Sequence, residues 1–142
     1  MNIDSIRNGI ALDHIRAGRA MQIYAALGLD SLDCTIAIIK NVRSGKMGRK
    51  DMIKIDERIG LDLDALGFID PNITINIIQG GEVIEKRQLK LPGELVNVIR
   101  CKNPRCITSI EQEAEQIFRL TGEGPPVYRC AYCETAYDPG GR

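Results

Sequence analysis

Residues 101–106 read CKNPRC and residues 130–133 read CAYC, so two short cysteine pairs lie late in the chain. Each short loop can present two thiolates to one ion, and four cysteines are a usual ligand set for tetrahedral Zn²⁺. We therefore expect one zinc ion, held by Cys101, Cys106, Cys130 and Cys133. Because four thiolates close the coordination shell, the expected role of the metal is structural rather than catalytic.

Two disulfides or four unrelated thiols are the alternatives to this metal site. The N-terminal sequence has no basic region followed by a long apolar run, and no apolar run is long enough to span a membrane. These features predict a cytoplasmic, reducing location, where clustered cysteines favour metal over disulfides. The fifth cysteine, Cys34, lies in an apolar stretch and is expected to be a small buried side chain.

Composition restricts the class of protein. The chain has 142 residues, of which 44% are hydrophobic and 27% charged, as in folded domains. Basic and acidic residues number 19 each, and this neutral balance argues against binding of long nucleic acids. The single histidine completes no Ser-His-Asp or Cys-His arrangement, so we expect a non-catalytic protein.

Hydrophobic spacing before the cysteines alternates between strand and helix patterns. It predicts strands at 6–15, 34–40, 52–57, 72–79 and 82–89, and helices at 17–27 and 61–66. The polar stretch 41–50 is expected to be a turn, and Gly80-Gly81 a tight hairpin turn. The order is β-α-β-β-α-β with one added strand, which predicts a ferredoxin-like α+β domain with helices on one face.

Leu91-Pro92-Gly93 interrupts this pattern. We therefore predict two domains, residues 1–92 and 93–142. The second should be a small β-rich zinc ribbon of the rubredoxin-like type, with a strand at 96–99 before the first cysteine pair. It has few large apolar residues, so metal binding would supply much of its folding free energy, on the order of ten kcal/mol.

Alternation in the predicted sheet places a set of polar side chains opposite its apolar face. This polar face could hold phosphates and hydrogen-bond a base through Lys50, Lys54, Asn76 and Lys86. Asp13 and His14 end the first strand, where an acid can accept from ribose hydroxyls and an imidazole can donate to phosphate. Ordinary solvated surface charge is the alternative for each of these side chains.

Four features together resemble the regulatory chain of aspartate carbamoyltransferase. They are GIALDHI at 9–15, SGKMGRKDMIKI at 44–55, PNITIN at 71–76, and the two cysteine pairs followed by Glu134. They occur in the family's order and span nearly the whole chain. The long stretch at 44–55 is highly specific, whereas a bare four-cysteine pattern is not.

The resemblance implies a non-catalytic regulatory subunit of pyrimidine biosynthesis. Its N-terminal domain would bind CTP and ATP, with UTP as a third candidate, and its zinc domain would dock on the catalytic chain. Regulatory chains would pair as homodimers that bridge catalytic trimers. By matching position, the implied effector site comprises Ile3, Asp4, Ile6, Ala11, Asp13, His14, Lys50, Lys54, Asn76, Ile78, Val83 and Lys86. The expected contacts to the catalytic chain flank the metal ligands and are Asn103, Arg105 and Glu134.

A zinc-ribbon module that binds nucleic acid is the main alternative. Basic side chains near the cysteine loops are compatible with it, namely Arg100, Lys102, Arg105 and Arg129. The neutral charge and the lack of an aromatic, basic face argue against it. A small-ligand domain fused to a redox or metal-storage module is a second alternative.

Overall fold

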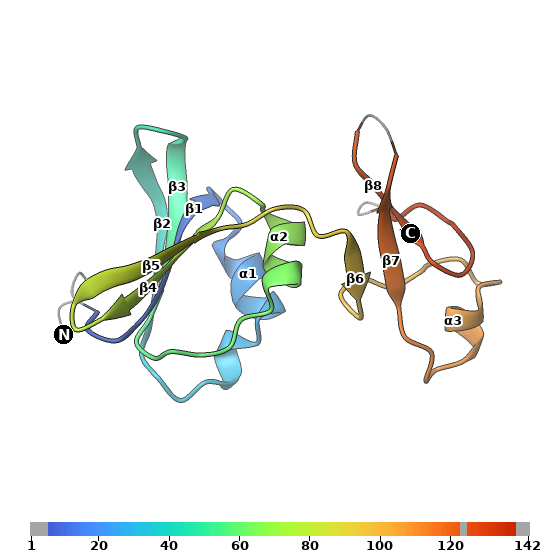
Figure 1. The fold of residues 1–142 in the computed structure, drawn as a ribbon, viewed down its shortest axis with the longest axis horizontal. Helices are drawn as coiled ribbons and strands as arrows, with labels where there is room; N and C mark the ends of the chain where they lie inside the picture. The colour runs from blue at the N-terminus through green and yellow to red at the C-terminus, as the bar shows by residue number, and fades with distance from the viewer. Residues whose placement is uncertain (1–5, 123–124, 139–142) are drawn as a thin grey trace. The chain divides into compact units, whose positions relative to one another are not determined.

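The computed structural model describes residues 6–122 and 125–138 and divides into two compact units, Met1–Leu91 and Pro92–Arg142. The first unit is a five-stranded antiparallel sheet with two α-helices, and the second is a three-stranded antiparallel sheet with one short helix (Figure 1). The predicted α+β fold class is therefore confirmed. Within the described residues, no helix is long and apolar enough to cross a membrane.

The first unit follows the predicted order of elements. They are β1 (Gly9–Arg16), α1 (Ala20–Ala26), the 3-10 turn η1 (Leu29–Ser31), β2 (Ile36–Ser44), β3 (Gly48–Ile55), α2 (Leu63–Ile69), β4 (Thr74–Gln79) and β5 (Glu82–Gln88). The strands lie in the order β2-β3-β1-β4-β5, so β5 extends a ferredoxin-like sheet at β4. Both helices lie on the same side of this sheet (Figure 1).

Alternating isoleucines and leucines build the core between the sheet and its helices. Leu12, Ile53 and Ile55 are fully buried, and so are Ile23 of α1 and Leu66 of α2. The intervening strand residues point away from the helices because successive side chains alternate between the two faces. The sheet therefore keeps a second face that neither α1 nor α2 covers.

Two β-bulges interrupt the regular pairing on either side of β3. The register of β1 shifts between Leu12 and Ile15, and that of β2 shifts between Ile39 and Val42. The bulges contain His14 and Asn41, whose φ angles are 59° and 60°. The first bulge explains why the residues of β1 in the core cluster follow the spacing 10, 12, 15 rather than strict alternation.

Several element boundaries differ from those predicted. The stretch 41–50 is mostly paired strand, because β2 continues to Ser44 and β3 begins at Gly48. This hairpin is polar on both faces, so its strands lack the alternation that reveals a strand in sequence. Helix α1 begins at Ala20, three residues later than expected, and ends before Gly28, whose φ of 63° terminates it. The Gly80-Gly81 turn is confirmed, with φ angles of 63° and 82°.

Gly9 lies where the backbones of two neighbouring strands approach closely. β1 is regularly paired there, and a Cβ at Gly9 would overlap the carbonyl oxygen of Ile55 on the neighbouring strand. Glycine is therefore required by the close approach of two backbones rather than by a bend.

The second unit consists of β6 (Glu94–Val96), α3 (Ile107–Ile110), β7 (Ile117–Thr121) and β8 (Val127–Cys130), with strand order β6-β7-β8. Leu95, Ile99, Phe118 and Tyr128 are its large buried apolar side chains. The strand predicted at 96–99 is wrong: β6 ends at Val96, because Asn97 adopts a φ of 58°. Helix α3, which follows Cys106, was not predicted.

Candidate functional site

The four cysteines of the two pairs converge in the second unit. Their Sγ atoms all lie within 4.8 Å of one another, with 3.6 Å between Cys101 and Cys133 and 3.7 Å between Cys106 and Cys130. A tetrahedral Zn²⁺ with Zn–S bonds of about 2.3 Å requires sulfur atoms about 3.8 Å apart. All four are free thiols, which contradicts the disulfide alternative, and their spacing fits a metal ion.

Hydroxyl and amide groups surround the sulfur atoms. Thr108 Oγ1 lies 3.1 Å from Cys106 Sγ, and Thr135 Oγ1 lies 3.2 Å from Cys133 Sγ. Burial acts to raise the pKa of Cys133, but hydrogen bonds from Thr135 and Asn103 outweigh it and lower this pKa to about 6. Burial raises the pKa of Cys101 to about 12, helped by the neighbouring sulfurs. The cluster thus contains a ready thiolate, the form that binds metal.

The uncovered face of the first sheet carries a row of directly opposed residues. Lys54 of β3 lies opposite Ala11 of β1, Ala11 opposite Asn76 of β4, and Asn76 opposite Lys86 of β5. Opposed residues share a face of the sheet, and adjacent strands are about 4.8 Å apart, so the row spans about 14 Å. Because the side chain of Ala11 is small, it leaves space above the sheet between the long side chains of Lys54 and Lys86.

Asn76 is in an unusual state at the centre of this row. Among the described residues, its Oδ1 is the one buried side-chain polar atom with no hydrogen-bond partner. Leaving a buried acceptor unpaired costs about 1–3 kcal/mol, and such groups are rare in folded proteins. The position is therefore suited to a ligand that supplies a donor.

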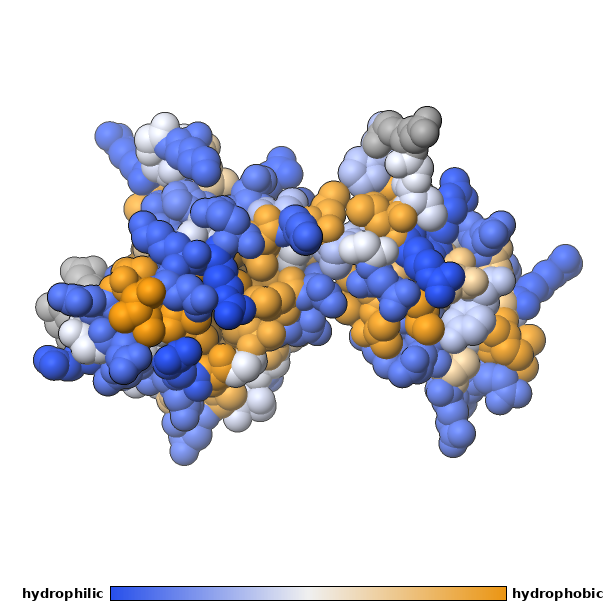
Figure 2. Space-filling view, in the orientation of Figure 1, coloured by the Kyte–Doolittle hydropathy of each residue, from blue (hydrophilic) through white to orange (hydrophobic). Residues whose placement is uncertain are grey.

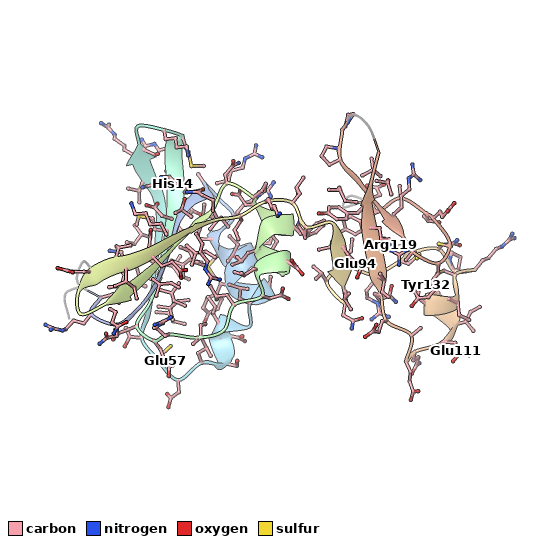
Figure 3. The ribbon with its side chains drawn as sticks, viewed as in Figure 1. His14, Glu57, Glu94, Glu111, Arg119 and Tyr132 are labelled. Carbon is pink, nitrogen blue, oxygen red and sulfur yellow. The ribbon has the colours of Figure 1, made fainter. Side chains whose placement is uncertain are left out.

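A second polar group lies where β1 is bulged. Lys50 Nζ and Asp13 Oδ1 form a 2.9 Å ion pair, and His14 Nδ1 lies 3.1 Å from Thr74 Oγ1. Burial acts to raise the pKa of Asp13, but the hydrogen bond from Lys50 and the backbone N–H of His14 outweigh it, so this pKa lies below its usual 3.8. Figure 3 labels His14 near the β2–β3 hairpin.

Apolar positions complete the surroundings of the row. Ile78 lies opposite Gly9 and Val83, and Val83 is 49% exposed. Figure 2 shows hydrophobic surface among hydrophilic surface over the β4–β5 hairpin. Ile6 is half-buried near the start of β1. Two further sequence-predicted residues, Ile3 and Asp4, lie outside the described residues.

Both units match known proteins. Residues 1–90 match the family model of the aspartate carbamoyltransferase regulatory chain, allosteric domain, and residues 93–139 match that of the same chain's metal binding domain. The chain belongs to the aspartate carbamoyltransferase regulatory chain family. A regulatory chain of Clostridium botulinum is 48% identical over 140 residues, covering 99% of this chain and 96% of the relative. Those of Clostridium acetobutylicum and Bifidobacterium longum are 47% and 40% identical, over 96% and 94% of this chain.

Membership of the regulatory chain family settles several expectations. The chain is a non-catalytic subunit, and its family implies the catalytic chain as its partner. The metal binding domain and the four-cysteine cluster together point to a bound metal.

The three residues expected to contact the catalytic chain surround the metal centre of this regulatory chain. Arg105 and Glu134 are exposed, and Asn103 is half-buried. The Oδ1 of Asn103 accepts a 3.0 Å hydrogen bond from the backbone N–H of Arg105, and its Nδ2 lies 3.4 Å from Thr135 Oγ1. Asn103 therefore links the loops of the two cysteine pairs, which is a structural role in addition to the expected one.

Sequence reasoning missed three side chains that support the metal centre. Thr108 and Thr135 each follow a ligand cysteine by two residues, and this repeated Cys-x-Thr pattern is a signal that could have revealed them. Gln116 is buried, and its Oε1 accepts a 2.9 Å hydrogen bond from the backbone N–H of Cys101. It lies far from the cysteine in sequence, so no local pattern identifies it.

Proposed function

We propose that the uncovered face of the first unit binds nucleoside triphosphate effectors, CTP and ATP, with UTP as a third candidate. The observation that carries this proposal is the unpaired, buried Oδ1 of Asn76 between Lys54 and Lys86. An amide can recognise the sugar or base, and flanking ammonium groups offset phosphate charge. The match of this unit to an allosteric domain supports the same interpretation.

Each side chain of the proposed site has a chemical role. Lys50, Lys54, His14 and Lys86 would offset the triphosphate charge, while Asp13 accepts from ribose hydroxyls and holds Lys50 by their 2.9 Å ion pair. Asn76 would bond near the sugar and phosphates. The walls around the base and its backbone partners are assigned to Ile3, Ile6, Ala11, Ile78 and Val83, and Asp4 belongs to the same site.

We further propose that the bound metal is one Zn²⁺ and that the module it stabilises docks on the catalytic chain. Thiolate ligands at tetrahedral spacing support the choice of zinc. Asn103, Arg105 and Glu134 are the proposed contacts to the catalytic chain. The proposed assembly joins catalytic trimers through regulatory homodimers, which pair through their first units.

The proposed regulation is a coupling between the effector site and the catalytic partner. An effector shifts an equilibrium only if its affinity differs between the two states of the assembly. Coupling free energies of this kind are typically about 1–3 kcal/mol, or roughly 5- to 150-fold in affinity. The metal acts indirectly, because it maintains the surface that receives the catalytic chain.

Calorimetric titration of the full chain with CTP, ATP and UTP tests the effector site. Lys54→Ala and Lys86→Ala should each weaken binding by about tenfold, since each removes one charge-assisted contact. Lys90→Ala is the matched control, because this exposed lysine follows the end of β5 and lies outside the row. Unchanged affinity in both row variants would refute the assignment.

A further inference from the structure

Asp51 occupies an unusual position in β3. Its side chain is fully buried, and it lies in the strand that both β-bulges flank. Oδ2 accepts hydrogen bonds from the backbone N–H groups of Gly18 and Ala20, at 3.0 and 3.1 Å. Oδ1 accepts from the backbone N–H of Asn41, at 2.8 Å.

These hydrogen bonds connect three segments that are separate in sequence. Gly18 belongs to the turn between β1 and α1, and Ala20 is the first residue of α1, whereas Asn41 is the left-handed residue of the β2 bulge. A buried carboxylate is costly unless its oxygens are satisfied, and here backbone donors satisfy both oxygens. One carboxylate therefore holds the turn after the β1 bulge and the β2 bulge in a single arrangement.

The neighbouring residue in β3 is Lys50, which faces the other side of the sheet. Lys50 lies opposite Arg16 on β1 and Val42 on β2, both just beyond the bulges. Its ion pair with Asp13 reaches across the β1 bulge. The positions of Lys50 and Asp13 thus depend on how both bulges are held.

The row of Lys54, Ala11, Asn76 and Lys86 crosses β1 before its bulge, where the pairing of β1 is regular. Its pairings of Ala11 with Lys54 and with Asn76 are flanked by unshifted pairs, such as Ile10 with Ile55. A change at Asp51 should therefore disturb one end of the face and leave the other in place.

We infer that Asp51 is a positioning residue for the Lys50 end of the effector face. The inference rests on the proposed function, in which Lys50 offsets triphosphate charge and Asp13 accepts from the ribose. Asp51 touches no ligand; it acts through the two bulges that set where Lys50 and Asp13 lie. The Lys54–Asn76–Lys86 row keeps its arrangement without this support, because its pairings lie outside the bulges.

Asparagine is the informative replacement for Asp51. It keeps the shape of the side chain, but its Nδ2 is a donor and cannot accept from a backbone N–H. Asparagine can thus satisfy either the Gly18 and Ala20 donors or the Asn41 donor, and it leaves the other side unpaired. Either the start of α1 with the turn before it, or the β2 bulge, then loses its attachment.

Titrations of the full chain with CTP and with cytidine test the inference. Asp51→Asn should weaken CTP binding about tenfold more than cytidine binding, because only CTP has phosphates for Lys50 to contact. Ile69→Val is the control for general destabilisation: it trims a buried side chain of α2 and should leave both affinities unchanged. Equal losses for the two ligands, or unchanged CTP affinity, would overturn the role of Asp51. A wild-type chain that binds neither ligand would instead remove the proposed function.

Wild-type amide resonances give a second test should Asp51→Asn fail to fold. The N–H groups of Gly18, Ala20 and Asn41 should exchange slowly with solvent, because the buried carboxylate accepts from all three. They should shift more on addition of CTP than on addition of cytidine. Fast exchange, or equal shifts with both ligands, would contradict the inference.

Discussion

Replacing Asn76 by valine should make the free protein more stable and its effector binding weaker. The Oδ1 of Asn76 is buried and has no hydrogen-bond partner. Valine has no polar side-chain atom, and its branched Cβ suits the middle of β4. A residue retained for ligand binding rather than for folding should show these opposite effects.

The structure sets the size of both effects. Burying an unpaired acceptor costs about 1–3 kcal/mol, so its removal should raise the free energy of unfolding of the first unit by about 1–2 kcal/mol. The same change deletes one hydrogen bond to the ligand, which corresponds to roughly tenfold weaker nucleotide binding.

Amide hydrogen exchange of the metal-loaded chain measures the stability of the first unit separately from that of the second. The slowest amides should lie in β1 and β4, in the core of the sheet. Calorimetric titration with CTP and ATP then measures affinity on the same samples.

Thr74→Val is the matched control, because Thr74 is a buried residue of the same strand whose hydroxyl is paired with His14 at 3.1 Å. Removing this paired hydroxyl should lower the free energy of unfolding by about 1 kcal/mol, the opposite sign to Asn76→Val. The reasoning fails if Asn76→Val destabilises the first unit, or if it binds nucleotides as tightly as the wild type.

Three further outcomes are expected. Removal of the metal with a mercurial should abolish amide protection in β6–β8 and release the catalytic chain, because metal binding supplies on the order of 10 kcal/mol to such small modules; retained protection after full metal loss would contradict this. Thr135→Val should speed metal transfer to a chelator by about tenfold, since it removes a hydroxyl 3.2 Å from Cys133 Sγ, and an unchanged rate would count against that support. Asp13→Asn should destabilise the chain at neutral pH, and the difference from wild type should vanish as pH falls through the lowered pKa of Asp13, below 3.8, where the Lys50 pair is lost. A difference that persists in acid would contradict the last expectation.

Local sequence patterns predicted the metal ligands and the two faces of the main strands. Cysteine pairs are recognisable because a short loop already places two thiolates near each other. Lys54 and Asn76 were assigned to the polar face because side chains alternate in any strand, whatever its neighbours. Their cross-strand alignment with Ala11 and Lys86 is consistent with that assignment.

Other predictions failed where pairing, rather than composition, forms a strand. Residues 43–44 and 48–50 are polar, yet they extend the β2–β3 hairpin through backbone hydrogen bonds. Conversely, residues 97–99 are partly apolar, but the left-handed backbone of Asn97 ends β6 before them. Backbone pairing depends on the partner strand, which a single segment does not reveal.

The sequence alone determined which residues are apolar, charged or thiol-bearing, and from their spacing it determined the order of the elements of the first unit. Only the tertiary structure decided the register of the strands, and with it the two bulges, the burial of Asp51 and the unpaired Oδ1 of Asn76. The physical reason is the separation along the chain of the residues that produce each feature. Side-chain alternation is a property of one strand, whereas a bulge or a buried carboxylate is stable only when donors from several distant segments meet at it.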